Sequence, residues 1–280
     1  MLGKHVAALD IDCLANSVWH LGEQIDLPLG GKRNFWFPRA MLWRKTDPND
    51  DLGETEVHLW RVGLDASGPA LAKLRETLSG DEVQRGERFR FPELQRRFVA
   101  CRGALRVILG GYLSVDPRRI DFGYTAHGKP FLKDPPGGIQ FNLSHSGGLM
   151  VAAICRAWRI GVDIEKEDPR FDARQIAERY FCAAERNEIA KSRPEDRFRA
   201  FFRLWTAKEA LLKGTSLGLT SELHQAEVSL APLRVVTMPG QEAGENWQLA
   251  AFDPGEGYSG SLAVAGTASR RDFRELDFSA

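Results

Sequence analysis

The spacing of apolar and polar residues predicts a chain that mixes strands and helices. Residues 56–64 and 160–165 alternate apolar and polar side chains, which is the period of a strand with one buried face. Residues 92–110 and 195–213 repeat apolar residues every three or four positions, and a glycine follows or ends each run, which predicts helices. Further strands are expected near residues 120–122, 139–143, 149–155, 227–230, 247–252 and 261–265, and further helices near 78–90, 172–180 and 183–191.

The two halves of the chain repeat one plan. Residues 98–110 and 202–214 align without gaps, begin with Phe, end with Gly and share much of their apolar pattern. We therefore expect an α+β protein, a pseudo-dimer of two similar α/β halves with the active site in the cleft between them. The expected division is an N-terminal extension (1–55), an N-terminal half (56–158), a C-terminal half (159–270) and a C-terminal tail (271–280).

Composition narrows the class of protein. The chain has 280 residues, 43% of them hydrophobic, and equal numbers of basic and acidic residues, 38 each. This balance argues against a general nucleic-acid binder or a binder of anionic membranes. The four cysteines form no CxxC pair, and no apolar run approaches the roughly 18 residues of a membrane span. We expect a soluble cytoplasmic protein without a secretory signal.

Two pairs of charged residues are candidates for chemistry. Glu209 and Lys213 are four residues apart on a predicted helix and therefore lie on one face. Asp163 and Glu165 project from the same face of a predicted strand. Together the carboxylates could hold Mg²⁺, with the lysine steadying a charged leaving group. The alternatives are an ordinary surface salt bridge and the solvated face of a strand.

Polar loop residues are candidates for binding phosphate. Residues 142–147, NLSHSG, offer an amide, hydroxyls, an imidazole and backbone donors. The main candidates among them are Asn142, Ser144 and His145. The alternatives are a polar turn or a serine nucleophile with a histidine base. The turn Gly128-Lys129-Pro130 is uninformative alone, and Arg85 belongs to a basic helical cluster that is either solvated or an anion clamp.

The ordered set of motifs resembles a known family. HGKPFL, FNLSHSGG, GVDIE, FCAAE and LWTAKEALLKG follow one another between residues 127 and 214. In this order they are similar to the 4′-phosphopantetheinyl transferases of the surfactin-synthetase-activating type, over roughly residues 57–270. The resemblance implies a monomer that binds coenzyme A between its halves, transfers the phosphopantetheine arm to a serine of an apo acyl or peptidyl carrier protein, and releases 3′,5′-ADP.

The resemblance also implies roles for individual residues. Asp163, Glu165 and Glu209 would hold Mg²⁺ on the pyrophosphate, and Glu209 would be the general base, directly or through a water. Lys213 would lie against the phosphates. The remaining coenzyme A contacts would be Ser144 and His145 with Asn142 of the same motif at the phosphates, Gly128, Lys129 and Pro130 beside the adenine, and Arg85 at the 3′-phosphate.

Glu185, the last residue of FCAAE, matches an acidic position near the metal in the family, although a glutamate at a helix start also has a structural reason. Two other readings of the whole chain remain open. One is a different Mg²⁺-dependent enzyme that cleaves nucleotides without a carrier protein, and the other is a catalytically silent module that binds carrier proteins.

Overall fold

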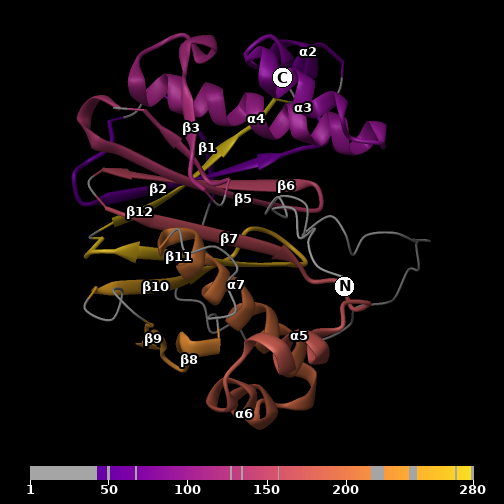
Figure 1. Cartoon of the computed structure of the whole chain (residues 1–280), viewed down its shortest axis with the longest axis vertical. Coiled ribbons are helices and arrows are strands. Elements are labelled where there is room, and N and C mark those ends of the chain that lie inside the picture. The colour runs from indigo at the N-terminus through magenta and orange to yellow at the C-terminus, as the bar shows by residue number, and fades with distance from the viewer. Residues whose placement is uncertain are drawn as a thin grey trace, which may run out of the picture.

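The computed structural model describes residues 43–48, 51–66, 68–126, 128–133, 135–156, 158–215, 224–239, 245–268 and 270–278. Most of the expected N-terminal extension and His127 of the HGKPFL motif lie outside these ranges. Figure 1 shows helices α2 to α4 at one end of the molecule and α5 to α7 at the other, with strands stacked between them. The mixture of helices and sheets confirms the predicted α+β class.

The elements follow the predicted order closely. The helices are α2 (Gly68–Arg75), α3 (Gly80–Glu87), α4 (Pro92–Leu113), α5 (Ala173–Tyr180), α6 (Ala183–Lys191) and α7 (Arg197–Thr215). The strands are β1 (Arg44–Lys45), β2 (Glu56–Gly63), β3 (Phe122–Tyr124), β4 (Pro130–Leu132), β5 (Ile139–Ser146), β6 (Leu149–Arg156), β7 (Ile160–Lys166), β8 (Glu227–Leu230), β9 (Leu233–Thr237), β10 (Trp247–Phe252), β11 (Tyr258–Ala265) and β12 (Arg270–Leu276).

The first sheet has the strand order β1-β12-β2-β6-β5, and one of its faces is covered by α4. Pro92 begins α4, where a missing backbone N–H costs nothing. The apolar side of α4, including Leu105 and Ile108, packs on Trp60 of β2 in a buried apolar core. The opposite face of the sheet, including Leu59 and β6, packs against the second sheet.

The second sheet has the order β10-β11-β7, and α7 lies along it. Helix and strand approach so closely at Gly161 that a Cβ there would lie 1.9 Å from the carbonyl oxygen of Ala210. Gly214 faces the ring of Trp247, where a Cβ would be 2.7 Å from ring carbon atoms. These contacts bring the polar side chains of β7 and α7 within bonding distance of one another.

Two sequence expectations are wrong in detail. Gly110 and Gly214 do not end their helices, because α4 continues to Leu113 and α7 to Thr215. Both glycines instead make room for close packing, Gly110 against Pro117 and Gly214 against Trp247. Ser114, with φ of 53°, takes the left-handed position that ends α4.

The C-terminal segment is not a tail. Residues 270–276 form β12, which pairs in parallel with β2 on one side and with β1 on the other. Arg274 and Asp272 are buried there and bond to each other. The end of the chain therefore crosses back and completes the sheet of the N-terminal half. No helix in the described part of the chain is both long and apolar enough to cross a membrane.

Candidate functional site

The centre of the site is a cluster of three side chains from three elements. The Lys213 ammonium, on α7, donates to the Asp163 Oδ1 of β7 at 2.7 Å and to the Ser144 Oγ of β5 at 2.9 Å. The Ser144 hydroxyl in turn donates to Asp163 Oδ1 at 2.8 Å. Asp163 and Ser144 are buried, and about a quarter of the Lys213 side chain is exposed. Three predicted site residues are thus brought together at the boundary between the two halves.

The carboxylates of the site are buried, and not all of their oxygens have hydrogen-bond partners within the described part of the chain. Asp163 Oδ2 and Glu209 Oε1 are both shielded from solvent without a hydrogen-bond partner among the described residues. Burial, with the neighbouring charges of Asp163 and Glu165, raises the pKa of Glu209 to about 8. Burial and the charge of Asp163 likewise raise the pKa of Glu165 to about 7. The cluster is short of positive charge.

Lys213 supplies part of that charge. Burial alone would lower its pKa, but Asp163 and Glu209 more than offset this, so that the pKa is raised and the ammonium stays charged. Burial raises the pKa of Asp163 even so, because one lysine serves more than one carboxylate. Such a set of mutually repelling acids beside one lysine is typical of a functional site rather than of a core.

The described residues of the site provide some ligands for a divalent cation but not a complete set. No group of three or more His, Cys, Asp or Glu side chains in the described ranges is arranged to hold a metal ion by itself. Mg²⁺, however, commonly takes only one or two carboxylates and completes its shell with water and substrate phosphate. The two unpaired oxygens, Asp163 Oδ2 and Glu209 Oε1, are suitable hard ligands.

Strand β5 presents polar side chains to β7 at every second position. Ser146 Oγ donates to Glu165 Oε2 at 2.8 Å and accepts from the Lys166 N–H at 3.0 Å. Asn142 Oδ1 accepts from the Val162 N–H at 2.8 Å, which fixes the edge of β7. Asn142 therefore has a structural bond in addition to its predicted role in binding. Ser146 belongs to the predicted NLSHSG stretch but was not singled out, although the alternation of a strand places it on the same face as Ser144.

His145 lies on the opposite face of β5 from Ser144, because neighbouring residues of a strand point to opposite sides. That is the face covered by α4, so the imidazole does not join the Lys213 cluster. It is directed instead to the side of the sheet where Arg85 of α3 also lies. The structure thus separates two residues that the sequence placed together.

Lys129 joins the hairpin of β3 and β4 to the end of α7. Its ammonium donates to the backbone carbonyl of Lys213 at 2.5 Å and approaches that of Ile160 at 3.4 Å. Burial, with help from Arg159 and Lys213, lowers the pKa of Lys129 to about 8. The last carbonyls of a helix lack partners within the helix, so Lys129 satisfies one of them from the other half of the molecule. The place of Lys129 beside the adenine stays a prediction, and in this structure its ammonium holds the backbone of Lys213.

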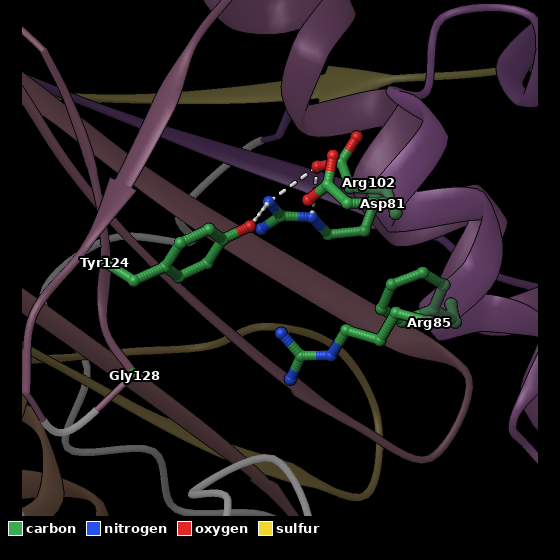
Figure 2. A pocket seen from close by; sticks show the side chains of 7 residues that line it. Asp81, Arg85, Arg102, Tyr124 and Gly128 are labelled. Atoms are coloured by element: carbon green, nitrogen blue, oxygen red, sulfur yellow. Dashed lines mark hydrogen bonds and ion pairs between the residues drawn. The ribbon is translucent and has the colours of Figure 1, made fainter.

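A pocket opens between α3, α4 and the β3–β4 hairpin (Figure 2). The Arg85 side chain points from α3 across this pocket toward Gly128 (Figure 2). The pocket has a volume of about 230 Å³, which is below the roughly 300–1,000 Å³ of pockets that hold whole small molecules. The pocket therefore suits one end of a larger ligand. The lining residues are Asp81, Glu82, Arg85, Phe98, Arg102, Tyr124 and Gly128.

Glu185 does not join the carboxylate cluster. It is fully buried at the start of α6, where its two oxygens accept from the Lys208 ammonium at 2.7 and 2.8 Å. It also accepts from the backbone N–H groups of Cys182 and Val228. The structural reason for this glutamate is therefore sufficient, and the metal-related position suggested by the motif is not supported.

Comparison with known proteins covers both halves. Residues 66–156 match the family described as "4'-phosphopantetheinyl transferase, N-terminal", and residues 159–265 match the "4'-phosphopantetheinyl transferase superfamily". The chain is 42% identical over 227 residues to the 4'-phosphopantetheinyl transferase HetI of Nostoc sp., covering 80% of this chain and 94% of the relative. It is 29% identical over 200 residues to the 4'-phosphopantetheinyl transferase Sfp of Bacillus subtilis, covering 67% and 88%.

A solved structure is also similar over part of the chain. It is a holo-(acyl-carrier-protein) synthase from Bacillus anthracis in complex with CoA (3',5'-ADP), at 20% identity and a TM-score of 0.33, covering 39% of this chain and 96% of that one. The sequence identity to HetI over nearly its whole length decides the assignment. The resemblance read from the motifs is confirmed, and the chain belongs to the 4′-phosphopantetheinyl transferase family.

Proposed function

We propose that this protein transfers the 4′-phosphopantetheine arm of coenzyme A to a serine of an apo acyl or peptidyl carrier protein, with Mg²⁺, and releases 3′,5′-ADP. The observation that carries the mechanism is the cluster of Asp163, Lys213 and Ser144 beside the unpaired oxygen of Glu209. Because one chain supplies both sides of this site, we propose that it acts as a monomer. We also propose that it acts in the cytoplasm.

The reaction exchanges a phosphoanhydride bond of coenzyme A for a phosphate ester bond to the carrier serine. The serine oxygen of the carrier forms a bond to the phosphorus that bears the pantetheine arm, and the bond from that phosphorus to the bridging pyrophosphate oxygen breaks. The serine proton must leave as the new bond forms, and 3′,5′-ADP departs with the bridging oxygen. The chain therefore has to supply a proton acceptor and positive charge on the leaving side.

Glu209 is our candidate for the proton acceptor. Its Oε1 is the unpaired carboxylate oxygen on α7, and the buried environment keeps bulk water from competing for the proton. The oxygen takes the serine proton directly or through one water. General bases of this kind contribute about 10²- to 10⁴-fold to a rate.

Lys213 is our candidate for stabilising the leaving group. Its pKa is raised, so it carries a full charge at neutral pH, and Ser144 and Asp163 fix the position of its ammonium. Lys129 fixes the backbone of the same residue. Charge that is held in place before the reaction stabilises a developing anion without reorganisation.

A divalent cation would be held by Asp163 and Glu209, with Glu165 beside them, and would supply charge neutralisation at the pyrophosphate when bound. The nucleotide end of coenzyme A would then extend toward the pocket lined by Arg85 and Gly128. Pro130 of the same hairpin would lie beside the adenine, and His145 would reach the 3′-phosphate from the α4 face. The pocket takes only one end of a ligand, which agrees with a molecule as long as coenzyme A.

The intact mass of an apo carrier protein after incubation with coenzyme A, Mg²⁺ and this enzyme tests the proposal. We expect the carrier to gain one phosphopantetheine group, and we expect chelator or the Glu209→Ala variant to abolish the gain. Fatty-acid, polyketide and peptidyl carriers should be tried side by side. If coenzyme A binds but no carrier is modified, the chain is a silent module. If coenzyme A is cleaved without any carrier, a different nucleotide-cleaving enzyme is indicated.

A further inference from the structure

The hydroxyl of Tyr124 has a position that the transfer chemistry does not explain. Tyr124 ends β3, and its ring reaches across the pocket toward Arg102 of α4 (Figure 2). The residue is 40% exposed. It is absent from every motif that identified the family. Its neighbours show what the hydroxyl can do.

The hydrogen bond at Tyr124 has a defined direction. Arg102 Nη2 lies 2.9 Å from the Tyr124 hydroxyl oxygen, and a guanidinium can only donate. The tyrosine oxygen therefore accepts this bond, and its own proton remains available. No acceptor for that proton is found among the described residues. Burial raises the pKa of Tyr124 above its ordinary value, so the group is a proton donor at neutral pH.

Arg102 is held in place by Glu82. Its Nε and Nη2 donate to Glu82 Oε1 at 2.9 and 2.7 Å, and Arg106 donates to Glu82 Oε2 at 2.6 Å. Arg102 and Arg106 are both less than a tenth exposed. The guanidinium of Arg102 is therefore committed to Glu82 and to the tyrosine oxygen. On the side of the pocket formed by Tyr124 and Arg102, the hydrogen-bond donor available to a ligand is therefore the hydroxyl of Tyr124.

The opposite wall carries a positive charge. Arg85 points into the same pocket from α3, over the ring of Phe98. One charged donor and one neutral donor that face the same small space suit a phosphate group, whose oxygens accept from both. Asp81, the other carboxylate of the lining, is engaged with Ser79 in the first turn of α3. The pocket thus has donors for an anion at one end of a larger molecule.

We propose that Tyr124 donates its hydroxyl proton to the 3′-phosphate of bound coenzyme A, opposite Arg85, and so makes the enzyme prefer coenzyme A over its 3′-dephospho form. This inference rests on the proposed function, because it takes coenzyme A as the ligand. It adds a specificity-determining residue that the motifs do not contain. The buried Glu82, Arg102 and Arg106 are the support that orients it.

Equilibrium binding separates this inference from the proposed function. The affinities of coenzyme A and 3′-dephospho-coenzyme A are measured by calorimetry for the wild type, Tyr124→Phe and Phe131→Leu. The first variant removes only the hydroxyl, and the second alters an exposed aromatic residue of the same hairpin that does not line the pocket. We expect Tyr124→Phe to weaken coenzyme A by about 10- to 100-fold, with 3′-dephospho-coenzyme A changed by less than about two-fold. Phe131→Leu should change neither.

Each other outcome has a distinct meaning. If Tyr124→Phe weakens both ligands equally, the hydroxyl contacts another part of the nucleotide and the inference is wrong. The same holds if neither affinity changes while the wild type binds coenzyme A. If the wild type binds neither ligand, the proposed function itself fails. As a further check, Arg85→Met should reduce the effect of Tyr124→Phe in the double variant, because both side chains would contact one phosphate.

Discussion

Two buried glutamates, one in each half, differ in how well they are paired. Both oxygens of Glu82 accept from arginines, Arg102 and Arg106, at 2.6 to 2.9 Å. Burial favours the neutral form of Glu82, but the two guanidiniums more than offset this, and its pKa is lowered. Glu209 is nearly as buried, yet its Oε1 has no partner in the described structure and its pKa is raised to about 8.

The same contrast occurs between neighbours on α7. Lys208 is fully buried and donates to both oxygens of Glu185 and to the Ala226 carbonyl. Glu209 follows it directly and points to the Asp163 cluster instead. Leaving a buried charge unpaired costs several kcal/mol, so a fold retains it where a ligand completes the pairing. A complete set of partners marks Glu82 and Glu185 as structural, and an incomplete one marks Glu209 as functional.

The largest expected effect is that of Glu209→Gln on catalysis. The variant keeps the size of the side chain and removes the proton acceptor, so single-turnover transfer should slow by about 10²- to 10⁴-fold. The amide also removes a carboxyl group whose ionisation burial and Asp163 oppose, so thermal stability should stay unchanged or rise. Rate and melting temperature are measured on the same preparation. Loss of both together would place Glu209 with the structural glutamates and remove the contrast.

The next effect is that of Glu185→Gln on stability. This change leaves the Lys208 ammonium buried without its counter-charge, which should cost about 3–5 kcal/mol in the free energy of unfolding. Denaturation by urea measures it. The double variant Glu185→Leu with Lys208→Met replaces the pair by apolar side chains and should recover much of the loss. If Glu185→Gln is as stable as the wild type, complete pairing does not identify structural charges in this protein.

Much of the site was predictable because it depends on local periodicity. Alternation placed Asp163 and Glu165 on one face of β7, and the helical spacing stacked Glu209 and Lys213 on α7. The order of the motifs added Ser144, and the resemblance to the family added Arg85. Short-range spacing fixes the direction of the two pairs on β7 and α7, and the packing of β7 on α7 brings these pairs together.

The remaining features depend on contacts between distant segments. Ser146 reaches Glu165 only through the register of β5 beside β7, and Tyr124 is oriented by Arg102, 22 residues earlier in the chain. The segment of β12, rich in arginine, gives little sign that it pairs with β2, more than two hundred residues away. Gly214 was predicted as a helix end, whereas close packing against Trp247 explains it. Single-sequence patterns cannot locate such partners.

The smallest expected effect is the loss of stability in acid caused by His58, a buried side chain whose ring is well paired only when it is neutral. His58 is 1% exposed, and its Nε2 lies 3.3 Å from Arg274 Nη2, which can only donate, so that nitrogen accepts. The other ring nitrogen, Nδ1, then carries the proton and faces the Tyr112 hydroxyl at 2.5 Å. Burial, with the charge of Arg274, lowers the pKa of His58 to about 4, although Glu56 and Asp272 act in the opposite direction. The neutral ring therefore has partners for both nitrogens. Acid turns it into a buried charge beside Arg274, with Glu56 Oε2 at 3.4 Å from Nε2 as its counter-charge.

Its pH dependence has a definite sign. The folded pKa of about 4 lies below the ordinary value of 6.5, so the unfolded chain binds more protons between these values. The stability that the neutral ring contributes is complete above pH 6.5 and is lost as the pH falls toward 4. Between pH 7 and pH 5 the wild type should lose about 2 kcal/mol more than His58→Gln, which has no ring to titrate. Urea unfolding at both pH values measures the difference, and parallel losses in the two proteins would show that folding does not lower the pKa of His58. NMR titration of the His58 ring in the wild type gives the same answer without a variant, because a midpoint near 6.5 would contradict the buried neutral state.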